Sequence, residues 1–140
     1  MKKLTAVVLA LLCVAVLLVS CSKESIYQPT EVENVSISIA DVSSTGATVT
    51  IKDTNKEPYV YGEWYKIEKY DDGKWIDIKT VISDYGFIEI GYLTNKDGEV
   101  EFVIDWEWLY GELPSDRYRI LKQVNQEYIS VEFDIAEATQ

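Results

Sequence analysis

Carboxylate pairs are the first residues in this 140-residue sequence whose type and spacing could support catalysis. Three pairs lie two residues apart, at Glu99/Glu101, Asp105/Glu107 and Glu132/Asp134. On β-strands each pair would share one face, and glycoside hydrolysis requires two carboxylates flanking the bond that is cleaved. Because the chain has 24 acidic residues, pairs at this spacing also arise by chance. We therefore interpret them as solvated strand faces.

The sequence lacks the residue types that most hydrolases use. It contains no His, which excludes His-based triads, His general bases and HExxH zinc sites. Asp71-Asp72-Gly73 and Asn95-Lys96-Asp97-Gly98-Glu99 offer oxygen ligands, but neither has the ligand spacing of an EF-hand. We interpret both as turns, with weak calcium binding as the alternative. The sequence predicts no enzyme and no cofactor.

Aromatic side chains are the strongest candidates for a binding surface. Four Trp and ten Tyr are many for a small domain. We expect Trp64 and Tyr70 to share the outer face of a hairpin, and Trp106 and Trp108 to lie near a corner. Exposed aromatic rings stack on sugars or anchor peptide partners. The alternative is that Trp106 fills the core and the tyrosines cover sheet faces.

Arg117 and Arg119 complete the candidate surface. They alternate with Tyr118, so on a strand both would project from the face opposite to it. Two arginines on one face could clamp a carboxylate or a phosphate. An intramolecular ion pair with one of the many acidic residues is the competing interpretation.

The charge balance argues against nucleic acid as a partner. The chain has 13 basic and 24 acidic residues, a net charge of −11. Without Lys2 and Lys3, which precede the folded part, 11 basic residues remain and the net charge is −13. Binding to phosphates requires Lys and Arg in excess.

The first 20 residues have the composition of a secretion signal. Lys2 and Lys3 precede an apolar run from Leu4 to Val19. Leu18-Val19-Ser20-Cys21 resembles a bacterial lipoprotein box, in which the Cys receives a diacylglycerol and becomes the new N-terminus. We predict a signal peptide over residues 1–20, lipidation of Cys21, and attachment to the extracytoplasmic face of the cell membrane. An uncleaved membrane anchor is the alternative.

The rest of the chain is predicted to form a tether and one domain. Residues 21–33 are polar and contain Pro29, so we predict a lipidated N-terminus with a flexible tether. The domain is predicted over residues 34–136, a length typical of one domain, and residues 137–140 are expected to fray. With Cys13 removed and Cys21 lipidated, the domain would have no disulfide.

Within the domain, apolar side chains recur at every second position, which is the period of half-buried strands. We predict strands around Val35–Ile39, Ala47–Ile51, Tyr59–Tyr70, Trp75–Ile78, Phe87–Leu93, Val100–Ile104, Tyr118–Lys122 and Ile129–Ile135. Asp72-Gly73 and Asp97-Gly98 are hairpin signals between them, and Asp105 is expected to cap one helical turn that Gly111 ends. The pattern predicts an all-β fold, an antiparallel two-sheet sandwich of about seven to eight strands.

Three segments carry a family resemblance. They are Tyr61-Gly62-x-x-Tyr65-x-Ile67-Glu68-Lys69, the turn Asp72-Gly73-Lys74-Trp75, and Asp105-Trp106-x-x-Leu109-Tyr110-Gly111-x-Leu113-Pro114-x-x-x-Tyr118-Arg119-Ile120. Together they resemble the bacterial Ig-like domain family, over roughly residues 34 to 135. The resemblance implies an Ig-like β-sandwich without known catalysis, in a secreted or membrane-attached protein of a Gram-positive bacterium.

In such sandwiches, a Tyr at the position of Tyr118 can bury its ring and donate a hydrogen bond to backbone. Related sequences usually have Gly where this chain has Asp116, so a left-handed, somewhat strained residue is expected there.

These observations predict a lipid-anchored, extracytoplasmic Ig-like domain that acts as a non-catalytic binding module. Its expected partners are the membrane, through the lipid on Cys21, and a protein or a cell-wall glycan. The alternative is an inhibitor or regulator of an envelope enzyme, with the hairpin tip at Asp71–Lys74 inserted as a wedge; a carbohydrate-binding module is a further alternative.

Overall fold

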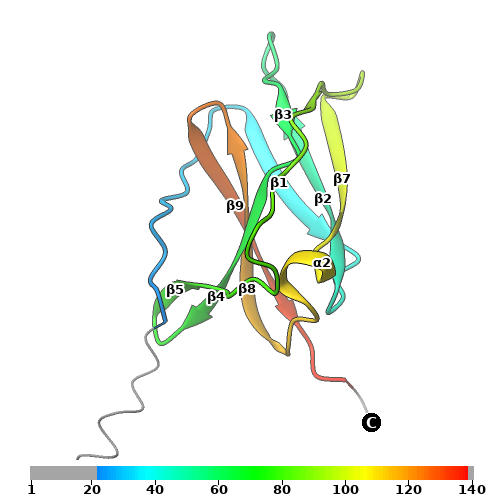
Figure 1. Cartoon of the computed structure of the whole chain (residues 1–140). Helices are drawn as coiled ribbons and strands as arrows, with labels where there is room; N and C mark the ends of the chain where they lie inside the picture. The colour runs from blue at the N-terminus through cyan, green and yellow to red at the C-terminus, as the bar shows by residue number, and fades with distance from the viewer. Residues whose placement is uncertain (1–21, 139–140) are drawn as a thin grey trace, which may run out of the picture.

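The strands form two antiparallel sheets that face each other, together with a short two-stranded ribbon (Figure 1). The computed structural model describes residues 22–138. One sheet has the order β1-β2-β7, the other has the order β5-β4-β8-β9, and β3 pairs with β6. The strands are β1 Val35–Ala40, β2 Gly46–Asp53, β3 Tyr61–Gly62, β4 Tyr65–Asp71, β5 Lys74–Asp77, β6 Gly91–Tyr92, β7 Glu99–Asp105, β8 Asp116–Val124 and β9 Glu127–Ile135. The predicted antiparallel sandwich is confirmed.

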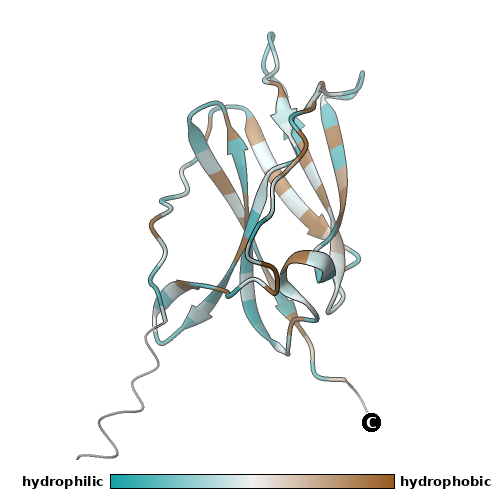
Figure 2. Ribbon diagram, in the orientation of Figure 1, coloured by the Kyte–Doolittle hydropathy of each residue, from teal (hydrophilic) through white to brown (hydrophobic). Residues whose placement is uncertain are grey.

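The core lies between the sheets, where the predicted alternation places apolar side chains. In β2 and β7 every second residue is buried, and Val49 lies opposite Phe102 in the register. The bands of hydrophobic and hydrophilic residues alternate along these strands in Figure 2. From the other sheet, Ile67 and Ile120 are fully buried against them. Hydrophobic burial across this interface therefore stabilises the sandwich.

Both predicted Asp-Gly turns are present. Asp72 and Gly73 have φ values of 47° and 79°, as a two-residue hairpin between β4 and β5 requires. Gly98 has a φ of 76°, and a Cβ at this position would lie 2.8 Å from the carbonyl oxygen of Asp53. Glycine at position 98 thus permits both the turn and the close approach of the end of β2.

The predicted helical turn and the aromatic corner close one end of the sandwich. Helix α2 spans Glu107–Tyr110, and the Asp105 carboxylate accepts a hydrogen bond of 2.9 Å from the Glu107 amide. The Tyr118 hydroxyl donates to the Pro114 carbonyl at 2.6 Å, as expected at this corner. Asp116 differs from expectation, because it begins β8 without a positive φ. Its carboxylate instead pairs with Lys69 at 3.1 Å.

The polar segment after Cys21 is not a free tether. We name residues 22–33 the strap. The strap lies along the outer face of the sheet β5-β4-β8-β9. The Ser25 amide donates to the Trp75 carbonyl, the Asp77 amide to the Lys23 carbonyl and the Thr30 amide to the Tyr128 carbonyl. The prediction of flexibility considered only the composition of the strap, whereas its backbone groups find partners on β5 and β9.

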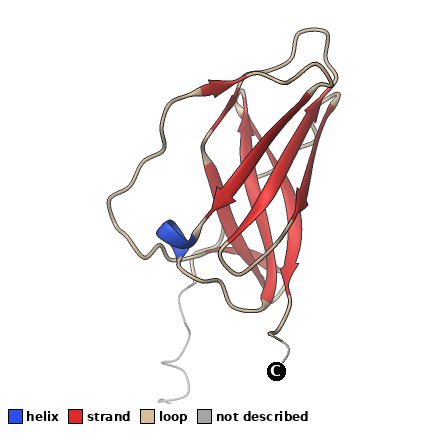
Figure 3. Ribbon diagram, turned by 90° about the vertical axis from the view of Figure 1, so that its right-hand side faces the viewer, coloured by secondary structure: helices blue, strands red, loops and turns tan. Residues whose placement is uncertain are grey.

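Two predicted strands are shorter than expected. The aromatic run from Tyr59 is interrupted at Glu63 and Trp64, which separate β3 from β4. Of the segment Phe87–Leu93, only Gly91 and Tyr92 pair with another strand. The chain from Ile78 to Ile90 instead forms a long loop, seen beside the sheets on the side of the helical turn in Figure 3.

Four charged residues are buried within residues 22–138, and two of them, Asp53 and Lys122, lie on the inner faces of their strands. Asp53 accepts hydrogen bonds from the Tyr61 hydroxyl and the Tyr59 amide, both at 2.8 Å. Burial alone would raise the pKa of Asp53, but these bonds and those from Asn55 hold it below its ordinary value. Lys122 points into the core, donates to the Gly62 carbonyl at 2.6 Å and lies over the Phe102 ring. Burial lowers the pKa of Lys122 to about 8.

Candidate functional site

The two arginines project from the same face of β8, as predicted, but intramolecular contacts engage both of them. The Arg117 guanidinium lies 4.5 Å from the ring centroid of Tyr70 and forms an ion pair of 2.6 Å with Glu132. Arg119 stacks on Trp75 at 4.6 Å. Tyr70 and Trp75 pack edge to face, with centroids 5.1 Å apart. Tyr70, Arg117 and Arg119 thus belong to a layer of stacked rings and cations rather than to an open clamp.

Beneath the strap, Arg119 forms a buried ion pair. Its Nη2 atom lies 2.6 Å from Oε2 of Glu68, whose side chain is fully buried. The Ser25 hydroxyl donates to the other oxygen of Glu68, and Arg119 also approaches the Tyr27 carbonyl at 3.4 Å. The strap therefore removes from solvent a pair that would otherwise lie on an exposed sheet face.

Two of the predicted binding tryptophans are covered. Trp106 is fully buried; its indole donates to the Ser44 carbonyl at 2.9 Å and its ring packs on Phe133. It fills the end of the core, which was the competing interpretation. Trp64 packs against Tyr27 of the strap and Tyr128 of β9, with centroids 5.8 and 5.5 Å away. Neither residue presents an open aromatic face.

Trp108 is the predicted aromatic residue that remains exposed. Its side chain is 42% exposed, and its ring lies edge to face with Tyr85 and Phe87 at 6.2 and 6.0 Å. Phe87 in turn packs on Tyr65 at 5.2 Å. Burial raises the pKa of Tyr65, so at neutral pH its hydroxyl is protonated and donates to the Asp105 carbonyl at 3.3 Å. These four rings form an aromatic cluster between the long loop, β4 and the helical turn.

A groove runs beside this cluster, between the long loop and β7. We name it the β7 groove, and its volume is about 380 Å³. The residues that line it are Glu63, Tyr65, Gly86, Phe87, Ile88, Val103, Ile104, Asp105 and Trp108. Among these lining residues the charged side chains are the two acids, Glu63 and Asp105. Ile88 and Val103 are 70% and 81% exposed. The groove therefore combines aromatic walls, exposed aliphatic side chains and negative charge.

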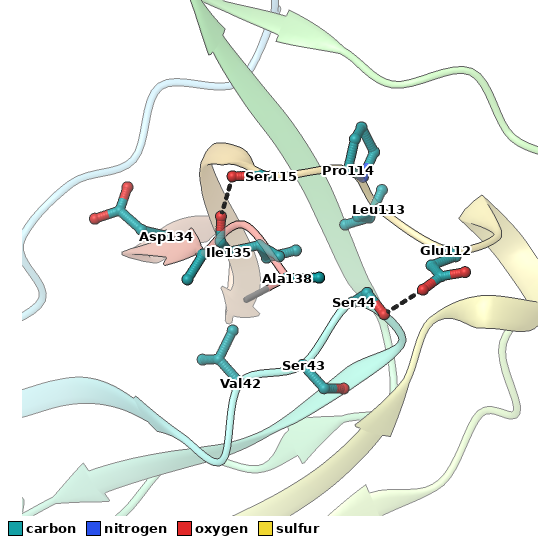
Figure 4. A pocket seen from close by; sticks show the side chains of 11 residues that line it. Val42, Ser43, Ser44, Glu112, Leu113, Pro114, Ser115, Asp134, Ile135 and Ala138 are labelled. Carbon is teal, nitrogen blue, oxygen red and sulfur yellow. Dashed lines mark hydrogen bonds between the residues drawn. The ribbon is translucent and has the colours of Figure 1, made fainter. Parts of the chain in front are cut away.

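A larger cavity of about 610 Å³ lies at the end of the sandwich (Figure 4). Two hydroxyls of its wall already have partners, because the Ser44 hydroxyl donates to Glu112 and the Ser115 hydroxyl to the Ile135 carbonyl. Ala138, the last residue described, forms part of its wall. We therefore regard the β7 groove as the better candidate.

Two of the three carboxylate pairs, Glu99/Glu101 and Glu132/Asp134, lie on strands, as the sequence indicated, whereas Glu107 of the third pair begins helix α2. Glu99 pairs with Lys52 at 3.7 Å, and Glu132 with Arg117. Within residues 22–138, no three acidic side chains are arranged to hold a metal ion. The same residues include no helix that is long and apolar enough to span a bilayer.

Comparison with known proteins assigns the family. The sequence model described as "Bacterial Ig-like domain" matches residues 31–135, so the chain belongs to this family and its sandwich is Ig-like. Membership suggests a non-catalytic module of the kind found outside the cell or at its surface. No curated protein and no solved structure matches the chain significantly. Cys21 and the predicted signal peptide lie outside the described residues.

The sequence did not single out the long loop as part of a site. The sequence predicts a strand over Phe87–Leu93, because its apolar character is typical of core residues. The available signal is the segment from Val81 to Leu93, which is rich in apolar residues but does not keep a strict alternation. A broken period in an apolar segment is consistent with side chains that do not all face the core.

Proposed function

We propose that this protein is a non-catalytic binding module, attached to the extracytoplasmic face of the membrane by lipid on Cys21, and that it contacts its partner through the β7 groove. The observation that carries the proposal is the exposed aromatic and aliphatic surface around Trp108. Within residues 22–138, eleven large hydrophobic residues are exposed; they include Val81, Ile82, Tyr85, Ile88, Ile90, Leu93, Val103 and Trp108, which lie on the long loop, β7 and their neighbours. Apolar patches with a polar rim mark interaction sites.

The binding proposal is tested by crosslinking in intact cells followed by purification of the protein. We expect a specific partner with the wild-type chain and with Ile26→Ala, a matched change at an apolar residue that is 72% exposed on the strap. Trp108→Ala should reduce recovery several-fold, because it removes a wall of the groove. Equal recovery with both variants would argue against this surface.

The anchor is tested by the intact mass of protein extracted from membranes. We expect a polypeptide that begins at Cys21 and carries about two or three acyl chains, because a single acyl chain would give only marginal anchoring. A free thiol at Cys21, or a retained signal segment, would contradict the lipid anchor.

The alternatives predict other results in the same assays. An inhibitor or regulator should be recovered with one envelope enzyme whose turnover falls when the protein is added. A carbohydrate-binding module should change its Trp fluorescence with cell-wall fragments, and Trp108→Ala should abolish that change.

A further inference from the structure

Strand β7 forms the edge of its sheet. Its hydrogen-bonded neighbour is β2, and among the described residues no strand pairs with its other side. Unpaired edges offer backbone donors and acceptors to an added strand. The long loop and the β7 groove lie on that open side, because Val103, Ile104 and Asp105 line the groove together with Gly86–Ile88.

The contacts of β7 identify which backbone groups face the open edge. Asn95 donates its amide to the Glu99 carbonyl, and its side-chain oxygen accepts from the Glu99 amide. Tyr65 donates to the Asp105 carbonyl. In an antiparallel strand the amide and carbonyl of one residue point to the same side, and alternate residues share that side. Glu99, Glu101, Val103 and Asp105 therefore direct their backbone groups away from β2.

Contacts thus occupy the two ends of this edge and leave its middle open. The amides and carbonyls of Glu101 and Val103 have no protein partner within residues 22–138. These four groups could bond two alternate residues of an added strand, since directly opposed residues exchange both hydrogen bonds. The segment that fits is short, because Asn95 and Tyr65 limit it on either side.

Side chains along the same edge specify the charge of the occupant. Glu101 and Asp105 are exposed and lie on the same outer face of β7, on either side of Val103. Opposite charges directly across a strand pair stabilise it, whereas like charges destabilise it. The alternate side chains of an added strand would point the other way, toward the aromatic cluster and Ile104.

We propose that the β7 groove binds an extended segment of a partner polypeptide, which adds to β7 as a strand, with basic side chains facing Glu101 and Asp105 and apolar side chains entering the groove. This inference rests on the proposed function and names the chemistry of its partner. Backbone bonds to Glu101 and Val103 supply the general affinity, and the alternation of basic and apolar residues supplies the selectivity.

The first test uses three peptides with the protein purified from membranes. The probe is a fluorescein-labelled heptapeptide of alternating Lys and Val, with Lys at both ends. In the added strand, the lysines would lie directly opposite Glu101 and Asp105. The backbone amides of the lysines would therefore point toward β7, and those of the valines would point away from it. N-methylation of the two inner lysines should weaken binding at least about tenfold, the loss of one to two hydrogen bonds. N-methylation of the valines should change it less than about threefold.

The second test changes the protein. Val103→Lys places a positive charge between the two acids, at a side chain 81% exposed, and should weaken binding of the unmodified probe at least about tenfold. Ile26→Lys makes the same charge change on the strap and should have less than about a threefold effect. Circular dichroism and thermal unfolding of both variants verify that the fold is retained.

The outcomes are separable from failure of the proposed function. Equal binding of both methylated peptides, or equal effects of Val103→Lys and Ile26→Lys, would show general electrostatic attraction and overturn strand addition. Failure of the probe to bind would overturn it as well, even if crosslinking recovers a Trp108-dependent partner and so supports the binding function. Binding of wall fragments in the groove without the peptide would also reject it.

Discussion

At the scale of single residues, two ion pairs on neighbouring positions of β8 are expected to differ greatly in their effect on stability. Arg119 and Glu68 are buried under the strap, whereas Arg117 and Glu132 are about half exposed. Removing one member of a buried pair leaves an uncompensated charge away from water, whereas solvent screens an exposed pair. The two pairs therefore provide a matched comparison within one sheet.

We predict that Glu68→Ala lowers the free energy of unfolding by about 3–5 kcal/mol. Glu132→Ala, at the exposed pair, should lower it by less than about 1 kcal/mol. Urea titration followed by Trp fluorescence measures both values. Similar losses in the two variants would mean that the strap does not exclude water from Glu68.

The buried Lys122 predicts an unusual dependence of stability on pH. Burial lowers its pKa to about 8 in the folded protein, whereas an unfolded lysine has a pKa of about 10.4. Between these values the unfolded chain binds more protons, so the free energy of unfolding should rise with pH, by at most about 3 kcal/mol. Lys122→Met should flatten this rise in urea titrations at pH 7.5, 9 and 10.

Above pH 10 the trend should reverse. Burial raises the pKa of Tyr110 and of Tyr118 to about 12, and also raises the pKa of Tyr61 and Tyr65. Tyrosines of the unfolded chain lose their protons near pH 10, so the folded state then binds more protons and loses stability as the pH increases. A monotonic fall from pH 7.5 upward in the wild-type protein would contradict the Lys122 prediction.

At the scale of elements, the strap is expected to behave as part of the sheet. We predict that Tyr27→Ala accelerates exchange of the Ser25, Thr30 and Asp77 amides by at least about tenfold, because the Tyr27 ring holds the strap against Trp64 and Tyr128. Ile26→Ala, at an exposed neighbour, should leave these rates unchanged. Hydrogen exchange measured by NMR gives these rates. Fast exchange in the wild-type protein would contradict a docked strap and support the prediction of a flexible tether.

The sequence predicted correctly those elements that depend mainly on residues close to them in the chain. The alternation in β2, β7 and β9 and the Asp72-Gly73 turn were sufficient to place those elements. Arg119 was also predicted correctly to lie on the face of its strand opposite to Tyr118. What could not be predicted was that this face is covered, because the strap has no periodicity of its own and depends on rings contributed by Trp64 and Tyr128.

The candidate site was predictable only in part for the same reason. Trp108 was identified by its residue type, but its neighbours Tyr85 and Phe87 belong to a loop that resembles a strand in composition. Whether Phe87–Leu93 pairs depends on a partner strand far along the chain, and only Gly91 and Tyr92 find one. Trp106 and Trp108 have the same type and nearly the same position, yet the helical turn buries the first and exposes the second.

At the scale of the whole molecule, the proposed anchor and the docked strap together determine orientation. Glu24 forms an isolated β-bridge with Ile76 of β5, so the β4–β5 hairpin lies beside the start of the described chain. The beginning of β7 lies at the opposite end of the molecule (Figure 1). With Cys21 lipidated, Cys substituted at Asp71 or Asp97 gives a single reactive thiol. We predict stronger energy transfer to labelled lipid headgroups from a dye at position 71 than from one at position 97. Equal transfer would indicate a freely tumbling domain.

Because the strap is bonded to the sheet from Lys23 onward, a lipid on Cys21, as proposed, would leave very little chain between the membrane and the rigid body. A domain mounted so closely would keep its groove at a nearly constant height above the bilayer, with β7 running along the long axis of the molecule. Soluble proteins would then meet the groove no more often than their concentration dictates. A neighbour fixed in the same leaflet, with an extended segment at that height, would meet it repeatedly.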